Sequence, residues 1–309
     1  MLKDCVLPAH FVSKIKTINY IRNKKGNDMS RDSLWQQLEN TLRAKIDEFD
    51  GVAGVSLKSF SSGNHISING DEVFPTASTI KIHILAKLFY LEEKGEIDLS
   101  ERIRFTQDKY GGGSGVIHFL ENDPEFTVLD VAILMMLASD NTATNMCIDI
   151  AGIEGINDLI QDMGLPETKL RRKMMDPEAI DRGDENVSTP NELVMMMNQL
   201  HNGKPTSKVS SQVLRIMSKP KSAYLNKAIG SELTVANKPG GMDKVRGDTG
   251  IVYLPNNPYT VSIMSKFSMV DSLSQEGFII DLARTIHRYM AIIEDTNEYG
   301  LGLPRTLPL

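Results

Sequence analysis

The sequence predicts an α+β fold, with one antiparallel five-stranded sheet, flanking helices and an additional all-α lobe. Strand-like segments occur only toward the two ends of the chain, two near the front and three near the back. Between them, apolar residues recur at helical spacing. A sheet assembled from both ends, with the middle forming a helical lobe, satisfies both observations. The chain has 309 residues, 41% hydrophobic and 24% charged, which is ample for such a globular protein.

The front of the chain is expected to form a helix, a hairpin and a second helix. Residues 32–49 have apolar side chains on one helical face. Strands are expected at 52–60 and 65–69, separated by a short polar turn. The next helix is opened by Ser78 and ended by Gly95.

The middle of the chain is expected to be helical. Helices are predicted at about 128–138, 142–151, 153–163, 190–200 and 211–217. A glycine-rich loop, 110–115, precedes them. Residues 164–190 form an omega-type excursion, polar and irregular, that is long enough to indicate a functional loop.

The back of the chain returns to strands, which are expected near 233–238, 249–254 and 259–267, before a last helix at about 276–294. We therefore predict a discontinuous sheet lobe, a helical lobe and two tails. Their bounds are 1–30 for the N-terminal tail, 31–72 and 219–295 for the sheet lobe, 73–218 for the helical lobe and 296–309 for the C-terminal tail.

Composition excludes several classes of partner. The formal net charge of −6 argues against nucleic-acid binding. No apolar run is long enough for a membrane span, and the first 27 residues lack the apolar core of a signal peptide, so we expect a cytoplasmic protein. Cys5 and Cys147 are not expected to form a disulfide. The six histidines show no metal-ligand spacing, and we expect neither a metal nor an organic cofactor.

Three short motifs carry the chemical information. They are Ser78-Thr79-Ile80-Lys81, Ser139-Asp140-Asn141 and Lys238-Pro239-Gly240. Alone, each is weak, because Ser-x-x-Lys occurs three times in this chain. Their order and their separations of 61 residues (Ser78 to Ser139) and 99 residues (Ser139 to Lys238) make the combination specific.

Ser78 and Lys81 form a candidate nucleophile and base. They lie three residues apart on a helix, hence on one face, and burial beside another cation lowers the pKa of a lysine enough for it to accept a proton. The alternative interpretation is that Ser78 only caps the helix and Lys81 only faces solvent. Likewise, Asp140 or Asn141 would cap the helix that follows, and Gly240 and Gly241 would suit a simple hairpin turn.

At these positions the chain resembles the class A β-lactamases and related penicillin-binding-type serine hydrolases. The resemblance covers about residues 31–295 and includes the segments 74–81, 139–145 and 238–241. It implies that Ser78 is the acylated nucleophile, Lys81 the base or proton relay, and Ser139 the donor to the leaving nitrogen. Asn141 would bind the amide of the substrate's side chain, and Lys238 would bind the carboxylate end of the substrate, with Gly240 also in the substrate-binding site. The backbone N–H groups of Ser78 and Gly241 would form the oxyanion hole.

Two departures from the family pattern concern deacylation and substrate binding. The family carries Glu-x-x-Leu-Asn in the long loop, whereas this chain reads Arg172-Lys173-Met174-Met175-Asp176-Pro177-Glu178, with methionine at the place of the glutamate. Asp176 or Glu178 would serve if the loop shifts. Pro239 replaces a hydroxyl residue that helps to bind the carboxylate, which suits an edge strand, and Arg246 is a candidate compensating anion partner.

The sequence therefore predicts a serine hydrolase that opens β-lactam amides through an acyl-enzyme on Ser78. The alternatives are an esterase or D-Ala-type peptidase with the same nucleophile, and a penicillin-binding protein or sensor that loses its acyl group slowly. An inactive scaffold fits least, because Ser78, Lys81, Ser139 and Lys238 are all present. The expected partner is a small-molecule substrate, either a β-lactam or an ester or peptide, and the sequence leaves the oligomeric state open.

Overall fold

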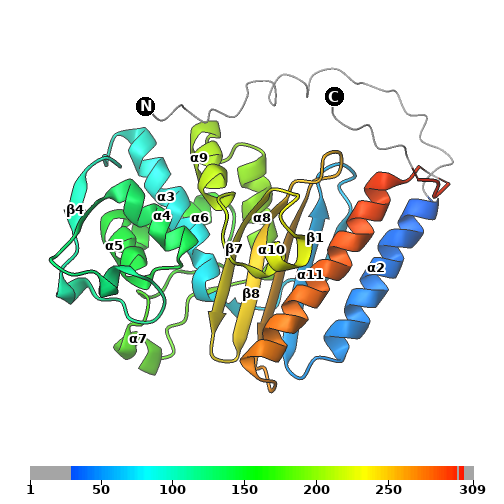
Figure 1. The fold of residues 1–309 in the computed structure, drawn as a ribbon, viewed down its shortest axis with the longest axis horizontal. Coiled ribbons are helices and arrows are strands. Elements are labelled where there is room, and N and C mark those ends of the chain that lie inside the picture. Colours follow the sequence, from blue (N-terminus) through cyan, green and yellow to red (C-terminus); the bar gives the residue numbers. More distant parts are fainter. Residues whose placement is uncertain (1–28, 298, 303–309) are drawn as a thin grey trace.

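A five-stranded sheet is the centre of the computed structural model, which describes residues 29–297 and 299–302 (Figure 1). Its order is β2-β1-β9-β8-β7, and every neighbouring pair is antiparallel. The strands are β1 (Val52–Ser59), β2 (His65–Ile68), β7 (Val235–Met242), β8 (Val245–Val252) and β9 (Tyr259–Lys266). The predicted α+β class, with one antiparallel sheet drawn from both ends of the chain, is confirmed.

The two terminal helices cover one face of this sheet. Helices α2 (Met29–Asp47) and α11 (Ser272–Asp295) lie side by side, and the short α10 (Tyr224–Ile229) packs against α11 (Figure 1). On α2, Leu38 and Leu42 recur at the four-residue spacing that places side chains on one helical face, and both are fully buried. They belong to an apolar core shared with the strands and α11.

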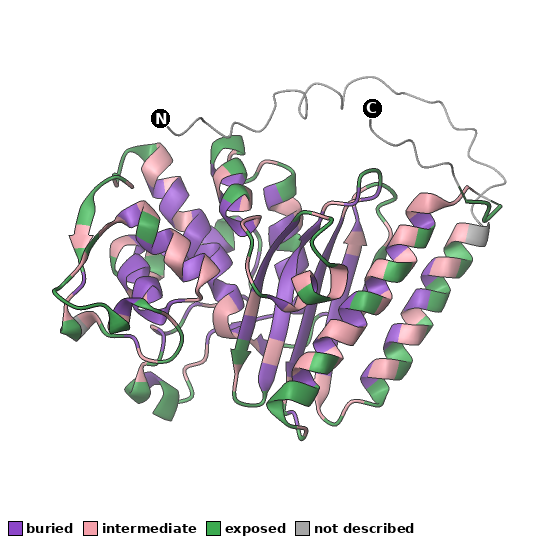
Figure 2. Ribbon diagram, in the orientation of Figure 1, coloured by how far each residue is buried: buried purple, intermediate pink, exposed green. Residues whose placement is uncertain are grey.

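A larger group of helices lies on the other side of the sheet and beyond its β7 edge (Figure 1). It comprises α3 (Lys81–Lys94), α4 (Val128–Leu137), α5 (Asn141–Ala151), α6 (Ile153–Asp162), α8 (Pro190–His201) and α9 (Ser207–Met217). A second apolar core joins most of these helices to β7 and β8. Because the central strands are covered on both faces, they are buried along most of their length (Figure 2).

The expectation that only helices separate the front and back strands was wrong. Two short ribbons pair β3 (Phe74–Pro75) with β6 (Val187–Ser188) and β4 (Arg102–Arg104) with β5 (Glu125–Thr127). A short helix, α7 (Pro177–Asp181), lies inside the 164–190 excursion. These elements have only two to five residues, which is too short for a periodic pattern to emerge.

Some expectations concern parts of the chain outside the described residues. Cys5, the segment inspected for a signal peptide and most of both predicted tails are among them. Cys147 is a buried free thiol on α5. None of the helices described in residues 29–302 has the length and apolar character needed to cross a bilayer.

Candidate active site

Ser78 lies in a tight turn between the sheet and α3. The turn is the 3-10 helix η1 (Ala77–Ile80), closed by Thr79 N donating to Thr76 O at 3.0 Å. Ala77 has a φ of 45°, a left-handed value that is uncommon outside glycine and often accompanies functional sites. α3 begins at Lys81, and its N-terminus has no side-chain cap. The interpretation of Ser78 as a simple helix cap was therefore wrong.

Lys81 is fully buried, so its interpretation as a solvated side chain was also wrong. Its Nζ lies 2.8 Å from Ser139 O, 3.0 Å from Asn141 Oδ1 and 3.2 Å from Ser139 Oγ. Burial, reinforced by the nearby charge of Lys238, holds the pKa of Lys81 well below its usual value. A neutral amine has two N–H groups, which suit the carbonyl and the amide oxygen. The lone pair of the amine can then accept the proton of the Ser139 hydroxyl when that hydroxyl rotates toward it.

Ser139 connects the three motifs. Its Oγ donates to Ser78 Oγ at 2.8 Å and accepts from Lys238 Nζ at 3.0 Å, in addition to its contact with Lys81. The residue has a φ of 52°, so this hydroxyl too is presented from a left-handed backbone position. One oxygen thus lies within hydrogen-bonding distance of the candidate nucleophile and both lysines.

Asp140 fixes the start of α5 to the residues that directly follow the glycine-rich loop. One of its oxygens caps the helix by accepting from Ala143 N at 2.9 Å. The other accepts from Val116 N at 2.6 Å and Ile117 N at 2.9 Å. Of the two caps that the sequence allows, Asp140 is the one observed.

The glycine-rich loop at 110–115 wraps around Asn141, a role that the sequence did not reveal. Asn141 Nδ2 donates to Gly112 O at 3.0 Å. A Cβ atom on Gly111 would lie 2.8 Å from the Asn141 carbonyl, and one on Gly113 would lie 2.8 Å from Nδ2. Only glycine allows the loop backbone to approach this closely. The run of glycines was the available signal, since glycine is the residue that permits such a close backbone approach.

Lys238 reaches the site from β7, the edge strand of the sheet. It is fully buried and also donates to Pro239 O at 3.1 Å. Burial lowers its pKa to about 7, while the negative charge of Asp248 acts in the opposite direction. The prediction that Pro239 suits an edge strand is confirmed, because β7 pairs on one side only.

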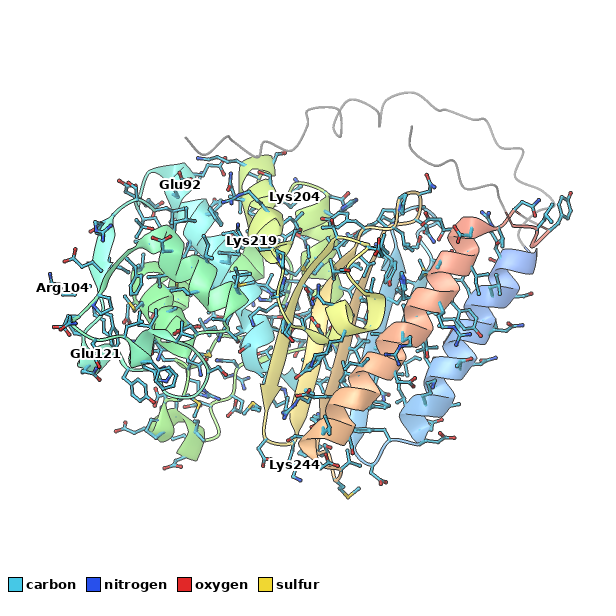
Figure 3. The ribbon with its side chains drawn as sticks, in the orientation of Figure 1. Glu92, Arg104, Glu121, Lys204, Lys219 and Lys244 are labelled. Carbon is cyan, nitrogen blue, oxygen red and sulfur yellow. The ribbon has the colours of Figure 1, made fainter. Side chains whose placement is uncertain are left out.

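Gly240 and Gly241 do not form a hairpin turn, since β7 runs through both to Met242. A Cβ atom on Gly240 would lie 2.8 Å from Thr76 O and 3.0 Å from Ser78 N, so β7 packs directly against the nucleophile turn. The actual turn to β8 contains Lys244, which Figure 3 labels at the end of the hairpin. The oxyanion-hole role of Ser78 N and Gly241 N stays a prediction.

The expected position of Arg246 was wrong. It is the register partner of Gly241 on β8, and a Cβ atom on Gly241 would meet its side chain on the face opposite to the one that Gly240 presents to Ser78. Its guanidinium donates to the carbonyls of Met242 and Val245 and lies 3.8 Å from Glu276 of α11. Arg246 therefore belongs to the helix-covered face of the sheet and does not join the Ser78 network.

The loop carboxylates are not brought to the nucleophile. Asp176 caps α7 by accepting from Ala179 N at 3.1 Å, and Glu178 is exposed on that helix. Met174 is buried, and its backbone is held by Asn145, which accepts from Met174 N at 2.7 Å and donates to Met174 O at 3.1 Å. Among the described residues, no carboxylate hydrogen bonds with the side chains of Ser78, Lys81, Ser139 or Lys238.

A family model settles the classification. The model described as the β-lactamase enzyme family matches residues 36–290. The chain belongs to this family. The observed sheet and the order of its motif-bearing segments agree with the resemblance noted in the sequence.

Relatives and solved structures are also similar to the chain. The chain is 25% identical to β-lactamase CARB-3 of Pseudomonas aeruginosa, over 82% of this chain and 90% of the relative. It is 25% identical to a β-lactamase of Streptomyces fradiae, over 82% of this chain and 86% of the relative. The structure of PBP-A is similar with a TM-score of 0.75 and 28% identity, covering 82% of this chain and 96% of that one. A β-lactamase from Sphaerobacter thermophilus has a TM-score of 0.76 and 25% identity, with 83% and 98% covered.

Proposed function

We propose that this member of the β-lactamase family is a serine hydrolase that opens β-lactam amides through an acyl-enzyme on Ser78. The observation that carries the proposal is the Ser139 hydroxyl, which lies 2.8 Å from Ser78 Oγ and 3.2 Å from a buried lysine amine. The named relatives are β-lactamases, and a solved PBP-A variant, 28% identical, is an acyl-enzyme complex with penicillin G.

Acylation needs a proton acceptor near Ser78, and burial makes the Lys81 amine such an acceptor. Hydroxyl protons rotate freely, so Ser78 can pass its proton to Ser139 Oγ as Ser139 passes its own proton to Lys81 Nζ. Ser78 Oγ then forms a bond to the lactam carbonyl carbon, and the carbonyl oxygen takes the negative charge. When the carbon–nitrogen bond breaks, the proton returns from Lys81 through Ser139 to the leaving nitrogen. The result is an ester on Ser78 and a neutral amine that carries the transferred proton.

Lys238 supports the same step as a cation. Its ammonium group, 3.0 Å from Ser139 Oγ, stabilises negative charge at the relay and would hold the anionic end of the substrate. Lys81 and Lys238 both contact one oxygen, so repulsion between them favours one neutral and one charged amine. Burial and the charge of Lys238 both lower the pKa of Lys81, which supports Lys81 as the base.

Deacylation is the slow step in this proposal. A water molecule must attack the ester, and no carboxylate among the described residues is hydrogen bonded to the Ser78 network to activate it. The second candidate function, a penicillin-binding peptidase or esterase, is favoured by this observation and by the 28% identity to PBP-A. A shift of the loop that brings Asp176 or Glu178 to the water would favour the first candidate function, the complete hydrolysis of β-lactams.

A chromogenic cephalosporin distinguishes these possibilities in one stopped-flow experiment. We expect a rapid burst equal to the enzyme concentration, followed by a slower steady rate, because acylation outpaces ester hydrolysis. Asp176→Asn and Glu178→Gln should each leave the burst intact. Either substitution should slow the steady rate only if the carboxylate that it removes positions the deacylating water. The absence of both burst and steady turnover would refute β-lactam opening.

A further inference from the structure

A buried carboxylate, Asp248, lies behind the strand that carries Lys238. It is fully inaccessible, and it is the register partner of Pro239 on the adjacent strand. Its oxygens accept from Asn237 Nδ2 at 3.0 and 2.9 Å and from Leu225 N at 2.9 Å. Among the residues that the structure describes, no lysine or arginine nitrogen lies within the 4.0 Å of a salt bridge. The carboxylate is therefore held by amides alone.

Two lysines interact with this carboxylate from a longer distance. Lys238 lies across β7, and Lys221 approaches from the segment before α10, donating to Met217 O and to Lys219 O at 3.2 Å. Arg246, which faces Glu276 of α11, and Tyr224, at the start of α10, lie on the same face of the sheet, and the charge of Asp248 also acts on Tyr224. Farther along this face, Tyr259 contacts His287 of α11. Lys81 faces Lys238 from α3.

A buried carboxylate without a close cation is costly, so its presence calls for a compensating use. Burial raises the pKa of Asp248 to about 6, and the hydrogen bonds from Leu225 and Asn237 limit that rise. Above this pH its charge favours the ammonium form of Lys238, while the charge of Lys221 disfavours it. The two groups thus act on Lys238 in opposite directions.

We propose that Asp248 is a positioning residue that keeps Lys238 protonated for acylation. Lys221 weakens this effect of Asp248 on Lys238. The inference rests on the proposed function, because it concerns the lysine that contacts Ser139 Oγ in that site. Asp248 touches neither Ser78 nor Lys81 and acts only through Lys238. It also anchors Asn237, the neighbour of Lys238, and so fixes the strand from which the lysine extends.

The structure provides a variant that removes the charge while keeping the hydrogen bonds. Asn237 Oδ1 is buried without a partner, and rotating that amide would bring the oxygen toward position 248. Asp248→Asn can therefore donate its new amide to Asn237 and still accept from Leu225 N. Asp243→Asn removes the same charge from the exposed β7–β8 turn and is the matched control.

The test is the pH dependence, from pH 5 to 9, of the second-order rate constant for acylation by penicillin G. In Asp248→Asn, the fall of the rate constant at high pH (the alkaline limb) should begin about 0.5–1 pH unit lower than in the natural chain. At pH values above that limb, the rate constant should therefore be roughly threefold to tenfold lower. The alkaline limb should move to higher pH in Lys221→Met and should stay in place in Asp243→Asn. Loss of stability alone would affect Asp248→Asn and Lys221→Met in the same direction, so opposite shifts support the proposal.

Two results overturn the inference in distinguishable ways. If the natural chain is acylated but neither variant moves the alkaline limb, or both move it the same way, Asp248 has no such role and the proposed function stands. If the natural chain is not acylated at all, the proposed function fails and this inference fails with it. Should Asp248→Asn not fold, as judged by circular dichroism, an unshifted limb in Lys221→Met refutes the proposal by itself.

Discussion

Adding a single methyl group at Gly240 should disable the site, although this residue has no side chain to take part in chemistry. Gly240→Ala would place a Cβ atom 2.8 Å from Thr76 O, 3.0 Å from Ser78 N and 3.2 Å from Thr79 N. Because all three are backbone atoms, no flexible side chain can move aside. The nucleophile turn and β7 must separate.

The required separation follows from the contacts. Ordinary van der Waals contact begins at 3.4 Å, so Thr76 O must recede by about 0.6 Å and Ser78 N by about 0.4 Å. Overpacking of this kind costs about 1–3 kcal/mol of the free energy of unfolding. A displacement of about half an ångström at the nucleophile should lower the acylation rate roughly 10- to 100-fold.

Gly241→Ala is the matched comparison. Its Cβ would meet only the flexible side chain of Arg246, at 3.2 to 3.4 Å, so acylation should fall less than about threefold. The assay is the rate of acyl-enzyme formation with a chromogenic cephalosporin, together with urea unfolding of each variant. Equal acylation rates in the two variants would refute the argument that β7 positions Ser78 by direct backbone packing.

Three further predictions concern the relay, the loop and pH. Ser139→Ala should lower the acylation rate by about 10²- to 10⁴-fold, and retention of more than a tenth of the rate would exclude a relay through this hydroxyl. Met174→Glu should speed the loss of the acyl group, because it places a carboxylate where the family carries its glutamate. It should also lower the melting temperature, because position 174 is buried. An unchanged decay rate would show that the loop cannot deliver a carboxylate to the ester. The acylation rate should rise with pH as Lys81 loses its proton and fall above about pH 7 as Lys238 does, so a rate that still climbs at pH 9 would contradict a cationic role for Lys238. Because the pKa of Lys238 falls from 10.5 unfolded to about 7 folded, the unfolded chain binds the extra proton between these values, and stability from this group should rise with pH across that interval. Lys81 and Lys221 have lowered pKa values as well and add to the same rise, so Lys238→Met should make the rise smaller in urea unfolding without removing it.

The long elements could be predicted from the sequence because their patterns repeat. The first helix, expected at 32–49, is Met29–Asp47, and the last, expected at 276–294, is Ser272–Asp295. β7 was expected to end at Lys238 but continues to Met242, since glycine and proline weaken strand signals even where an edge strand tolerates them. α10 has six residues, too few to reveal a period.

The site was predictable to the extent that spacing implies proximity. The three motifs do meet at Ser139 Oγ. Arg246 was misplaced because side chains alternate between the two faces of a strand, and the observed register pairs it with Gly241, on the face away from Ser78. Asp248 gave no signal in the sequence, since a lone aspartate in a strand does not reveal that it will be buried without a close cation.

Intact-mass spectrometry after mixing the chain with excess penicillin G tests the central claim most directly. We expect a mass increase of one intact penicillin on the natural chain, located on Ser78 by peptide mapping, and none on Ser78→Ala. The decay of that adduct over time would give the rate of deacylation. An adduct of equal yield on Ser78→Ala, or one that maps to another residue, would contradict the assignment of Ser78 as the nucleophile.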